Sequence, residues 1–352
     1  MKKFLRVLLI LLLVIVVAVG GLLGWLTATE FRPEPVESLD FLTHSDEAAT
    51  IPNDAELKIL SWNVGYAGLG KDSDFFMDGG KDARSADQAT VQEYLAGISG
   101  VINGGEYDFV MLQEVDTDSS RTYGINEAKA LAFGTSSFAF NYSCPFVPVP
   151  VPPLGKVNSG LLSCSAYEVS EAERLSLPCP FSWPLRIANL KRCLMVSYLP
   201  IENSDKQLVL VNLHLEAYDD GEGKIAQTNQ LREFINSEYQ KGNYVIAGGD
   251  FNHVISGMDP AWQQARAGLW MPGVLDVSEF GDVLSAIMPD NGPTCRSLDQ
   301  PLAGADLSTF QFYLIDGFIV SNNVQVNLLE TDDRGFLCAD HNPVRLQVTL
   351  MP

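Results

Sequence analysis

Several strand-like runs of apolar residues in this chain end at polar side chains that bind metal ions or transfer protons. The run Phe109–Gln113 leads directly into Glu114, and the run Tyr244–Gly248 leads through one further glycine into Asp250. A carboxylate at the end of a buried strand is costly unless it is paired or bound to a cation. We therefore predict that these strand ends meet at one metal-dependent site. The stretches concerned are Ser61–Asn63, Leu112–Glu114, Asn212–His214, Gly249–Asn252, Leu314–Val320 and Asp340–His341.

The N-terminus carries an uncharged run, Val7–Leu26, which follows the basic residues Lys2, Lys3 and Arg6. At about 1.5 Å per residue, such a helix spans roughly 30 Å, the thickness of a bilayer core. Basic flanks stay on the cytoplasmic side of a membrane. We therefore predict a single-pass protein of the cell membrane, with residues 1–6 cytoplasmic, residues 7–26 as a transmembrane signal-anchor helix, and the remainder extracellular.

A cleaved signal peptide is the competing interpretation, because Ala18–Gly20 offers small residues suited to a cleavage site. The apolar run continues past that point through Leu22, Leu23 and Trp25, which is long for the apolar core of a signal peptide. This length favours an uncleaved anchor.

The chain is acidic, with a formal net charge of −21. Without the three basic residues of the N-terminal flank, 20 basic residues face 44 acidic ones. Such a surface repels polyanions and anionic lipid, and no run rich in Lys and Arg is present to follow a phosphate backbone. The charge favours a lipid head group or a small molecule over nucleic acid, although a bound cation changes the local field at a site.

Beyond the apolar run, residues 27–56 are acidic and lack periodic apolar positions, which predicts a flexible linker. Residues 57–352 then form one catalytic domain. Helical spacing of apolar residues occurs in Val91–Ile102 and in Ile225–Tyr239. Strand-like runs alternate with these helices, so we predict an α/β fold with two packed sheets. The strand-like runs are Leu57–Asn63, Phe109–Gln113, Ser159–Ser163, Cys193–Leu199, Leu208–Leu215, Tyr244–Gly248, Phe312–Val320 and Val344–Leu350.

Two further features restrict the interpretation. The six cysteines include no CxxC pair, which argues against a zinc knuckle or a redox motif and leaves any disulfide pairing open.

The proline-rich stretch Phe146–Pro153 favours an extended loop over a central strand. That loop is either an ordinary surface loop or a rim that touches membrane or substrate.

Two strands place pairs of polar residues on one face. Asp250 and Asn252 are two positions apart, as are Asn212 and His214, and positions i and i+2 of an extended segment point the same way. A carboxylate can orient or deprotonate a water molecule, while amide and imidazole groups donate to phosphoryl oxygens. Each pair taken alone has a structural alternative, namely a turn that caps a strand or a hydrogen-bonded histidine.

The predicted metal ligand is Glu114, and Asn63 can complete the set of ligands around the ion. Oxygen ligands suit Mg²⁺, which keeps several waters and needs only one or two protein carboxylates. Zinc is less favoured because few histidines and no suitably spaced cysteines are present. Near the C-terminus, we predict that the buried Asp316 orients His341, which follows Asp340.

The ordered motifs resemble those of the endonuclease/exonuclease/phosphatase superfamily, which has the DNase I-like fold. They are Ser61–Asn63, Leu112–Glu114, Asn212–His214, Gly249–Asn252, Ile315–Ser321 and Asp340–His341. Two further segments, Asn63–Gly70 and Phe75–Gly80, resemble a bacterial membrane-anchored branch. One departure is Ala339, where the family often has serine before the final Asp-His.

The resemblance implies a four-layer sandwich of two mixed or antiparallel β-sheets flanked by helices, here preceded by one transmembrane helix. It implies Mg²⁺, with Mn²⁺ as a substitute, bound chiefly through Glu114 with Asn63 and Asp340 close by. It implies His341 paired with Asp316, and water activation involving Asp250. The phosphate contacts that it implies come from Asn212, His214 and Asn252.

The expected function is hydrolysis of a phosphodiester by in-line attack of water, in a membrane-anchored monomer that faces outward. The substrate would be a lipid head group, a nucleic acid or a small phosphate ester. One alternative is a phosphomonoesterase of the same fold, similar to inositol-phosphate phosphatases. Another is a catalytically silent surface-binding module, which would show damage in at least one motif, and none is damaged.

Overall fold

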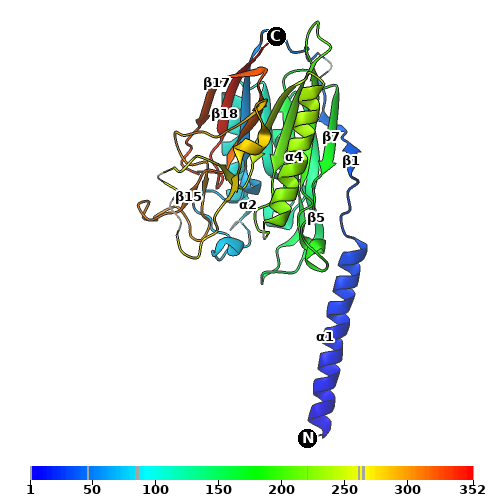
Figure 1. Ribbon diagram of the computed structural model, residues 1–352. Coiled ribbons are helices and arrows are strands. Elements are labelled where there is room, and N and C mark those ends of the chain that lie inside the picture. Colours follow the sequence, from blue (N-terminus) through cyan, green and yellow to red (C-terminus); the bar gives the residue numbers. More distant parts are fainter. Residues whose placement is uncertain are drawn as a thin grey trace.

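The computed structural model describes residues 2–45, 47–84, 87–219, 221–260, 262–263 and 266–351. A long helix, α1 (Lys2–Ala28), projects from a body built of strands and helices (Figure 1). The other helices of the described residues are α2 (Gln88–Gly104), α3 (Glu127–Leu131), α4 (Glu222–Gln240) and the short 3₁₀ segments η1 (Gly65–Ala67), η2 (Phe76–Asp78), η3 (Ser120–Thr122), η4 (Leu185–Ala188) and η5 (Val277–Phe280).

Two seven-stranded sheets form the body. The first sheet has the order β1-β7-β8-β9-β10-β16-β13, with β1 (Val36–Ser38), β7 (Glu171–Ser176), β8 (Cys193–Pro200), β9 (Gln207–His214), β10 (Tyr244–Asp250), β16 (Asp316–Ser321) and β13 (Leu284–Ile287). The second sheet has the order β17-β18-β3-β4-β6-β5-β2, with β17 (Val324–Thr331), β18 (Val344–Leu350), β3 (Glu56–Asn63), β4 (Phe109–Asp116), β6 (Gly155–Ser165), β5 (Thr135–Val147) and β2 (Phe41–Thr43). Two small ribbons pair β11 (His253–Ile255) with β12 (Gly273–Leu275), and β14 (Cys295–Arg296) with β15 (Phe312–Tyr313).

Residue alternation along the strands explains how the two sheets pack. In β3, Leu57 and Ile59 enter the core between the sheets, while Leu60 and Trp62 point to the outer face. In β10, Ile246 faces inward, and Val245 and Ala247 face outward. Because successive side chains of a strand point to opposite faces, each sheet buries one face against its partner sheet and the other against helices.

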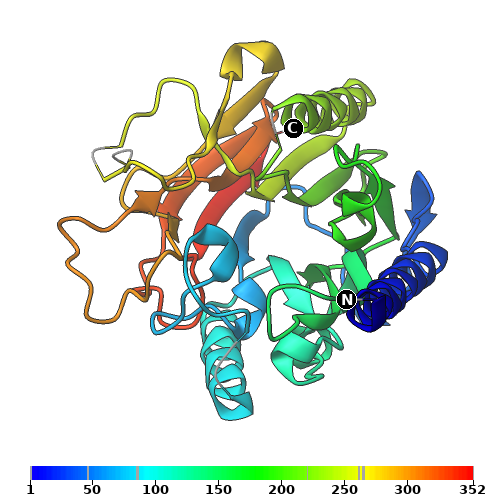
Figure 2. The same cartoon turned by 90° about the horizontal axis from the view of Figure 1, so that it is seen from below.

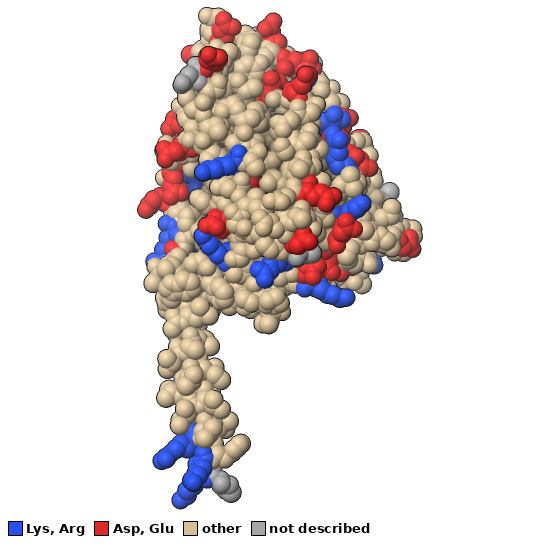
Figure 3. Space-filling model, turned by 180° about the vertical axis from the view of Figure 1, so that it is seen from behind, with Lys and Arg blue, Asp and Glu red and all other residues tan. Residues whose placement is uncertain are grey.

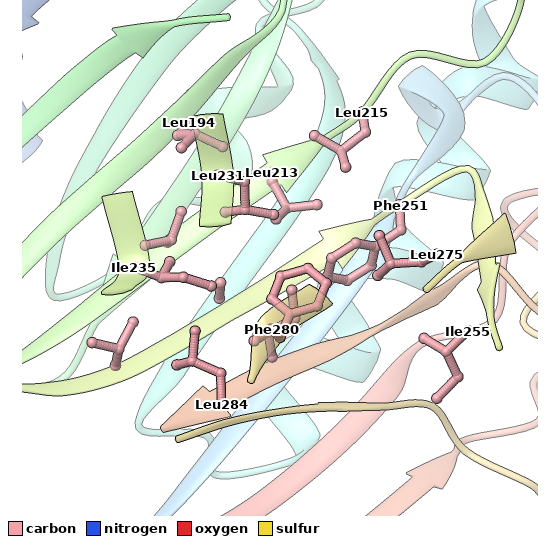
Figure 4. Packing of buried hydrophobic residues seen from close by; sticks show 14 of the residues in the cluster. Leu194, Leu213, Leu215, Leu231, Ile235, Phe251, Ile255, Leu275, Phe280 and Leu284 are labelled. Atoms are coloured by element: carbon pink, nitrogen blue, oxygen red, sulfur yellow. The ribbon is translucent and has the colours of Figure 1, made fainter. Parts of the chain in front are cut away.

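Helices cover both outer faces (Figure 2). Leu231 and Ile235 of α4 pack on outward residues of the first sheet such as Leu194 and Leu213, and Figure 4 shows this packing together with Phe251 and Phe280. On the other side, Val91, Tyr94, Ile98 and Ile102 of α2 cover the second sheet. The order helix, sheet, sheet, helix confirms the predicted four-layer sandwich.

The acidic segment 27–56 differs from the flexible linker predicted for it. β1 pairs with β7 and β2 pairs with β5, so this segment adds an edge strand to each sheet. Ile51 is fully buried in the core between the sheets. The sequence did not predict these strands, because edge strands of three residues contain too few apolar positions to show a strand period.

The last turn of α1 docks on the body. Leu26 is buried against Val147, Leu154 and Ile187, which lie at the turn between β5 and β6 and in η4. Directly after the helix, the Glu30 carboxylate accepts hydrogen bonds from Nε and Nη2 of Arg186 at 2.8 and 3.2 Å. The Arg186 guanidinium lowers the pKa of Glu30 to about 2. The helix therefore leaves the body from a fixed point.

The shaft of α1 is long and apolar enough to cross a membrane by length and composition. Figure 3 shows its surface free of charged atoms except at the far end, where Lys2, Lys3 and Arg6 lie. A signal sequence near an N-terminus has the same properties.

Candidate active site

The inner face of each sheet changes from apolar to polar toward one end. The inward positions of β3 run from Leu57 and Ile59 to Ser61 and Asn63, and those of β9 run from Leu208 and Leu210 to Asn212 and His214. In each sheet, β3 runs parallel to β4 and β9 runs parallel to β10. The C-terminal ends of these neighbouring strands therefore lie at the same end of their sheet. The polar ends of both sheets therefore meet at one end of the sandwich.

Asp250 lies at the centre of this cluster. Its Oδ2 atom accepts a hydrogen bond from Nδ2 of Asn63 at 3.0 Å, and the same amide nitrogen donates to Oε1 of Glu114 at 3.1 Å. Nε2 of His214 lies 3.4 Å from the same Oδ2 atom. Burial, followed by the nearby Asp316 carboxylate, raises the pKa of Asp250 to about 7.

His341 is held by Asp316. Nδ1 of His341 donates to Oδ2 of Asp316 at 2.8 Å, and Nε2 of the same ring lies 3.8 Å from Oδ2 of Asp250. Asp316 reaches this place because β16 pairs antiparallel with β10 and sets Asp316 opposite Asp250. Burial opposes the charged imidazolium, but the Asp316 carboxylate outweighs burial and raises the pKa of His341 well above its usual range. Burial and the Arg192 guanidinium instead lower the pKa of His214.

The three residues predicted to hold the metal lie close together. Asn63 Oδ1 accepts from the backbone N–H of Gly65 at 3.0 Å, and a Cβ atom at Gly65 would lie 2.6 Å from Oδ1 of Asp340. Gly65 has a φ of +49°, so this close approach needs a glycine. Glu114 joins the group through its hydrogen bond with Asn63.

This donor set fits a divalent cation. Oδ1 of Asp340 is buried and has no hydrogen-bond partner, which is costly for a carboxylate oxygen unless a cation is bound. Burial, with the Glu114 carboxylate adding to it, raises the pKa of Asp340 to about 7. The carboxylates of Glu114 and Asp340 and the amide of Asn63 are the hard oxygen donors that Mg²⁺ prefers.

Glu114 reaches the site through a β-bulge. Strict alternation would put it on the outer face with Leu112, but the pairing of β4 with β6 shifts register between Leu112 and Val115. Glu114 adopts a left-handed backbone with φ +54°, and Val115 then returns to the outer core. The bulge adds one residue and redirects the carboxylate into the site.

Asn252 and Asn212 occupy different environments. Asn252 lines the cleft, its Nδ2 donates to the Leu215 carbonyl at 2.9 Å, and its backbone N–H donates to Asp250 Oδ1 at 2.9 Å. Asn212 is fully buried between the sheets, one inward position deeper than His214. Its Nδ2 donates to the carbonyls of Leu112 and Leu162 at 3.1 and 3.0 Å, and its Oδ1 accepts from Gln113 at 2.8 Å.

The structure therefore does not place Asn212 where a phosphate could reach it, in contrast to the prediction. The alternation rule put Asn212 on the correct face but could not give its depth. Its hydrogen bonds connect the two sheets directly beneath the site.

The polar cluster lies in a cleft of about 580 Å³. Among the lining residues that sequence reasoning missed, Tyr66 is buried, its hydroxyl has no hydrogen-bond partner, and its ring lies 3.5 Å from the Arg121 guanidinium. Tyr66 belongs to the segment Asn63–Gly70, and Asp78, which accepts a hydrogen bond from the Tyr218 hydroxyl at 3.0 Å, belongs to Phe75–Gly80. The two segments singled out by their resemblance thus supply part of the cleft wall.

All three arginines that line the cleft are already engaged. Arg121 makes two hydrogen bonds of 2.9 Å to Asp116, and Arg192 donates to Glu216 at 3.2 Å. Nη2 of Arg296 donates to three backbone carbonyls of the segment 69–73. No lysine is found among the described lining residues. The cleft therefore has few basic groups to follow a polyanionic backbone.

The six cysteines, all within the described residues, are free thiols, and four of them are buried. Cys295 lies close to His341 and Asp340.

Comparison with known proteins identifies the fold. The model of the Endonuclease/Exonuclease/phosphatase family matches residues 60–318. No curated protein matches the chain in sequence. A solved endonuclease/exonuclease/phosphatase from Beutenbergia cavernae DSM 12333 superposes with a TM-score of 0.56 at 16% identity, covering 84% of this chain and 72% of that one.

Two further solved structures share the fold. The endonuclease/exonuclease/phosphatase from Bacteroides vulgatus gives a TM-score of 0.51 at 15% identity and covers 84% of this chain and 99% of its own. ANGEL2, a 2',3'-cyclic phosphatase in complex with adenosine-2',3'-vanadate, gives 0.53 at 15% identity and covers 90% and 99%. The family match spans most of the body. The chain therefore belongs to the endonuclease/exonuclease/phosphatase family and is a metal-dependent hydrolase of phosphate ester bonds.

Proposed function

We propose that this protein is a membrane-anchored, Mg²⁺-dependent phosphodiesterase that hydrolyses its substrate by in-line attack of water on phosphorus. The proposal rests on the groups that surround one oxygen atom, Oδ2 of Asp250. Oδ2 of Asp250 has Asn63 at 3.0 Å, His214 at 3.4 Å and His341 at 3.8 Å. One potential base is thus enclosed by potential hydrogen-bond donors from both sheets.

Glu114, Asn63 and Asp340 are the residues that would hold Mg²⁺, with Mn²⁺ as a substitute. When bound, the ion supplies positive charge against the phosphoryl oxygens and neutralises the clustered carboxylates. Protein side chains carry out proton transfer and hold the phosphate.

Asp250 would accept a proton from the attacking water, and Asn63 keeps its carboxylate in place. The oxygen of that water forms a bond to phosphorus while one ester P–O bond breaks. The departing alkoxide takes up a proton and leaves as an alcohol, so the products are a phosphomonoester and an alcohol.

His341 and His214 would donate to the phosphoryl oxygens as negative charge develops there. Asp316 accepts from Nδ1 of His341, which fixes the ring and leaves Nε2 for the substrate. Asn252 uses one amide hydrogen on the Leu215 carbonyl and retains the other for a phosphate contact. Asn212 has a supporting role, since it holds Gln113 beneath the site.

The shape of the cleft favours a diester over a monoester. This cleft extends well beyond the polar cluster. A diester needs room for two alcohol groups, one on each side of phosphorus.

For the location, we propose that residues 1–6 lie in the cytoplasm, that residues 7–26 anchor the protein, and that the catalytic domain, 57–352, faces the exterior. The basic residues at the start of α1 and its charge-free shaft support this orientation. We also propose that the protein acts as a monomer.

The test is turnover of bis(p-nitrophenyl) phosphate by the full chain in detergent with Mg²⁺. Asp250→Asn should lower kcat by at least about a hundredfold, in line with the loss of a general base. The matched control is Asp276→Asn at the exposed cap of η5, which should leave kcat unchanged. Near-normal turnover by Asp250→Asn would contradict the proposal, as would turnover of p-nitrophenyl phosphate much faster than that of the diester.

A further inference from the structure

The cleft does not end at the polar cluster. From Asp250 and His341 it continues past the 3₁₀ segment η2 and the turn between β5 and β6, and it reaches Leu23 and Leu26 of α1. One continuous cleft therefore joins the catalytic residues to the helix that is long and apolar enough to cross a membrane.

The walls of this extension are apolar. Met77 of η2, Val149 of the proline-rich turn and Leu185 of η4 all line it, and these side chains are 55%, 58% and 66% exposed. Apolar side chains that border a cleft and remain exposed to water favour an apolar occupant. The proline-rich stretch is thus a rim of the cleft, the second of the two interpretations that its sequence allowed.

The cleft reaches α1 at the depth where a bilayer surface would lie. The uncharged run ends at Leu26, and Leu23 and Leu26 are the helix residues that line the cleft. Trp25 and Trp183 lie at the same level, 47% and 55% exposed, and Trp183 Nε1 donates to Thr27 Oγ1 at 3.2 Å. Exposed tryptophans of this kind favour the interface between lipid and water.

The docking of α1 keeps the mouth of the cleft at this level. Leu26 packs on Val147 and Ile187, and Glu30 is bonded to Arg186 and lies 3.4 Å from Lys191. Figure 1 shows α1 leaving the body at one end of the sandwich. The cleft that holds Asp250 and His341 reaches this helix at Leu23 and Leu26, so the catalytic end of the sandwich faces the same way as the helix. A lipid in the bilayer around α1 would therefore meet the apolar end of the cleft first.

We infer that the substrate is a phosphodiester lipid of the same membrane, whose hydrocarbon part occupies the apolar extension while its phosphate lies at Asp250, His214 and His341. This inference rests on the proposed phosphodiesterase function and names its substrate class. Water adds to phosphorus and one of the two ester bonds breaks, which yields a phosphomonoester and an alcohol. The engaged arginines and the absence of lysine among the described lining residues are consistent with a substrate that carries a single phosphodiester.

The test compares membrane lipids with water-soluble substrates on one protein. The full chain is reconstituted with Mg²⁺ into vesicles that mix phosphatidylcholine, phosphatidylethanolamine, phosphatidylglycerol and sphingomyelin, and phosphomonoester release is measured. The same preparation is assayed on water-soluble bis(p-nitrophenyl) phosphate, on DNA and on RNA. The variant is Leu185→Asp at the mouth of the cleft, and its matched control is Val274→Asp on β12, which is 65% exposed and does not line the cleft.

Leu185→Asp should lower lipid hydrolysis at least about tenfold, the size expected when a charge replaces one apolar contact. It should leave turnover of the soluble diester within about twofold, and Val274→Asp should change neither activity. Turnover of the soluble diester with no hydrolysis of any of the four lipids would overturn the lipid inference and leave the proposed function standing. An equal loss on both substrates in Leu185→Asp would also overturn it, as would faster cleavage of DNA or RNA than of lipid. Failure on every substrate would instead overturn the proposed phosphodiesterase function.

Discussion

His341 and Asp316 form a buried pair in which Nδ1 of the imidazole donates to Oδ2 of the carboxylate at 2.8 Å. This hydrogen bond fixes which ring nitrogen faces the cleft, because Nε2 then lies 3.8 Å from Oδ2 of Asp250. A histidine that stabilises charge on a substrate needs both a fixed tautomer and a fixed ring orientation.

Replacing Asp316 by asparagine should therefore lower kcat by about a hundredfold or more without unfolding the protein. The amide has nearly the same shape as the carboxylate, but it lacks the charge that supports the imidazolium. We expect the loss to appear in kcat rather than in KM, measured on bis(p-nitrophenyl) phosphate with circular dichroism as the check on folding. An unchanged kcat would show that the pair only supports the fold.

Asn212 and His214 offer a direct contrast between support and catalysis. Asn212→Ala should lower the free energy of unfolding by about 1–3 kcal/mol, because it removes the hydrogen bonds that the Asn212 amide makes with Gln113 and with two backbone carbonyls. The turnover of the molecules that remain folded should be within a few-fold of normal. His214→Ala should do the reverse, with a large loss of kcat and a small change in stability. Urea unfolding and initial rates measured on both variants decide the matter, and a catalytic loss in Asn212→Ala with full stability would contradict the buried placement.

Removal of divalent cations should abolish activity, and Mg²⁺ should restore it. Glu114→Gln should weaken Mg²⁺ binding by at least about tenfold, because Glu114 is one of the two charged donors of the group and glutamine keeps only its shape. Calorimetric titration of the full chain with Mg²⁺ gives the affinity independently of turnover. Restoration by Zn²⁺ but not by Mg²⁺ or Mn²⁺ would contradict the choice of ion.

Asp78 should make stability depend on pH. Burial raises the pKa of Asp78 to about 6 from 3.8, so the folded protein resists ionisation of this carboxyl more than the unfolded chain does. An acid of this kind imposes no penalty below about pH 4. The penalty grows as the pH rises from about 4 to about 6, where only the unfolded chain has lost the proton, and it stays constant above that pH. Asp78→Asn, which can still accept from Tyr218, should therefore raise Tm at pH 8 by roughly 2 °C or more and change it little at pH 4. The control is Asp205→Asn, whose side chain is 89% exposed and which should leave Tm unchanged at both pH values.

The positions that sequence reasoning located best follow regular strand periodicity. Asn63, His214, Asp250 and Asp316 all lie on inward positions at the ends of strands, and the helices around Val91 and Leu231 have the spacing of amphipathic helices. Parallel pairing of β3 with β4 and of β9 with β10 then brings their ends together.

What could not be predicted depends on irregular backbone or on depth. The bulge at Glu114 breaks the period that the prediction uses, and no local signal marks a left-handed glutamate. The burial of Asn212 depends on contacts with the opposite sheet, which lie about a hundred residues away in sequence. The strands β1 and β2 are three residues each and are stabilised by the sheet edges that they join, so their own composition suggested a linker.

The ion pair between Glu30 and Arg186, together with the strands that follow it, has a consequence for kinetics. A domain on a slack tether samples a broad zone above its membrane, and its rate depends on how often the site happens to approach the surface. In the anchored arrangement that we propose, the connection between α1 and the body is short and is bonded on both sides, so the site keeps a constant height above the membrane that α1 crosses. For a substrate dissolved in that plane, encounter becomes a two-dimensional search governed by lateral diffusion. The apparent rate should then follow the surface density of substrate and not its bulk concentration.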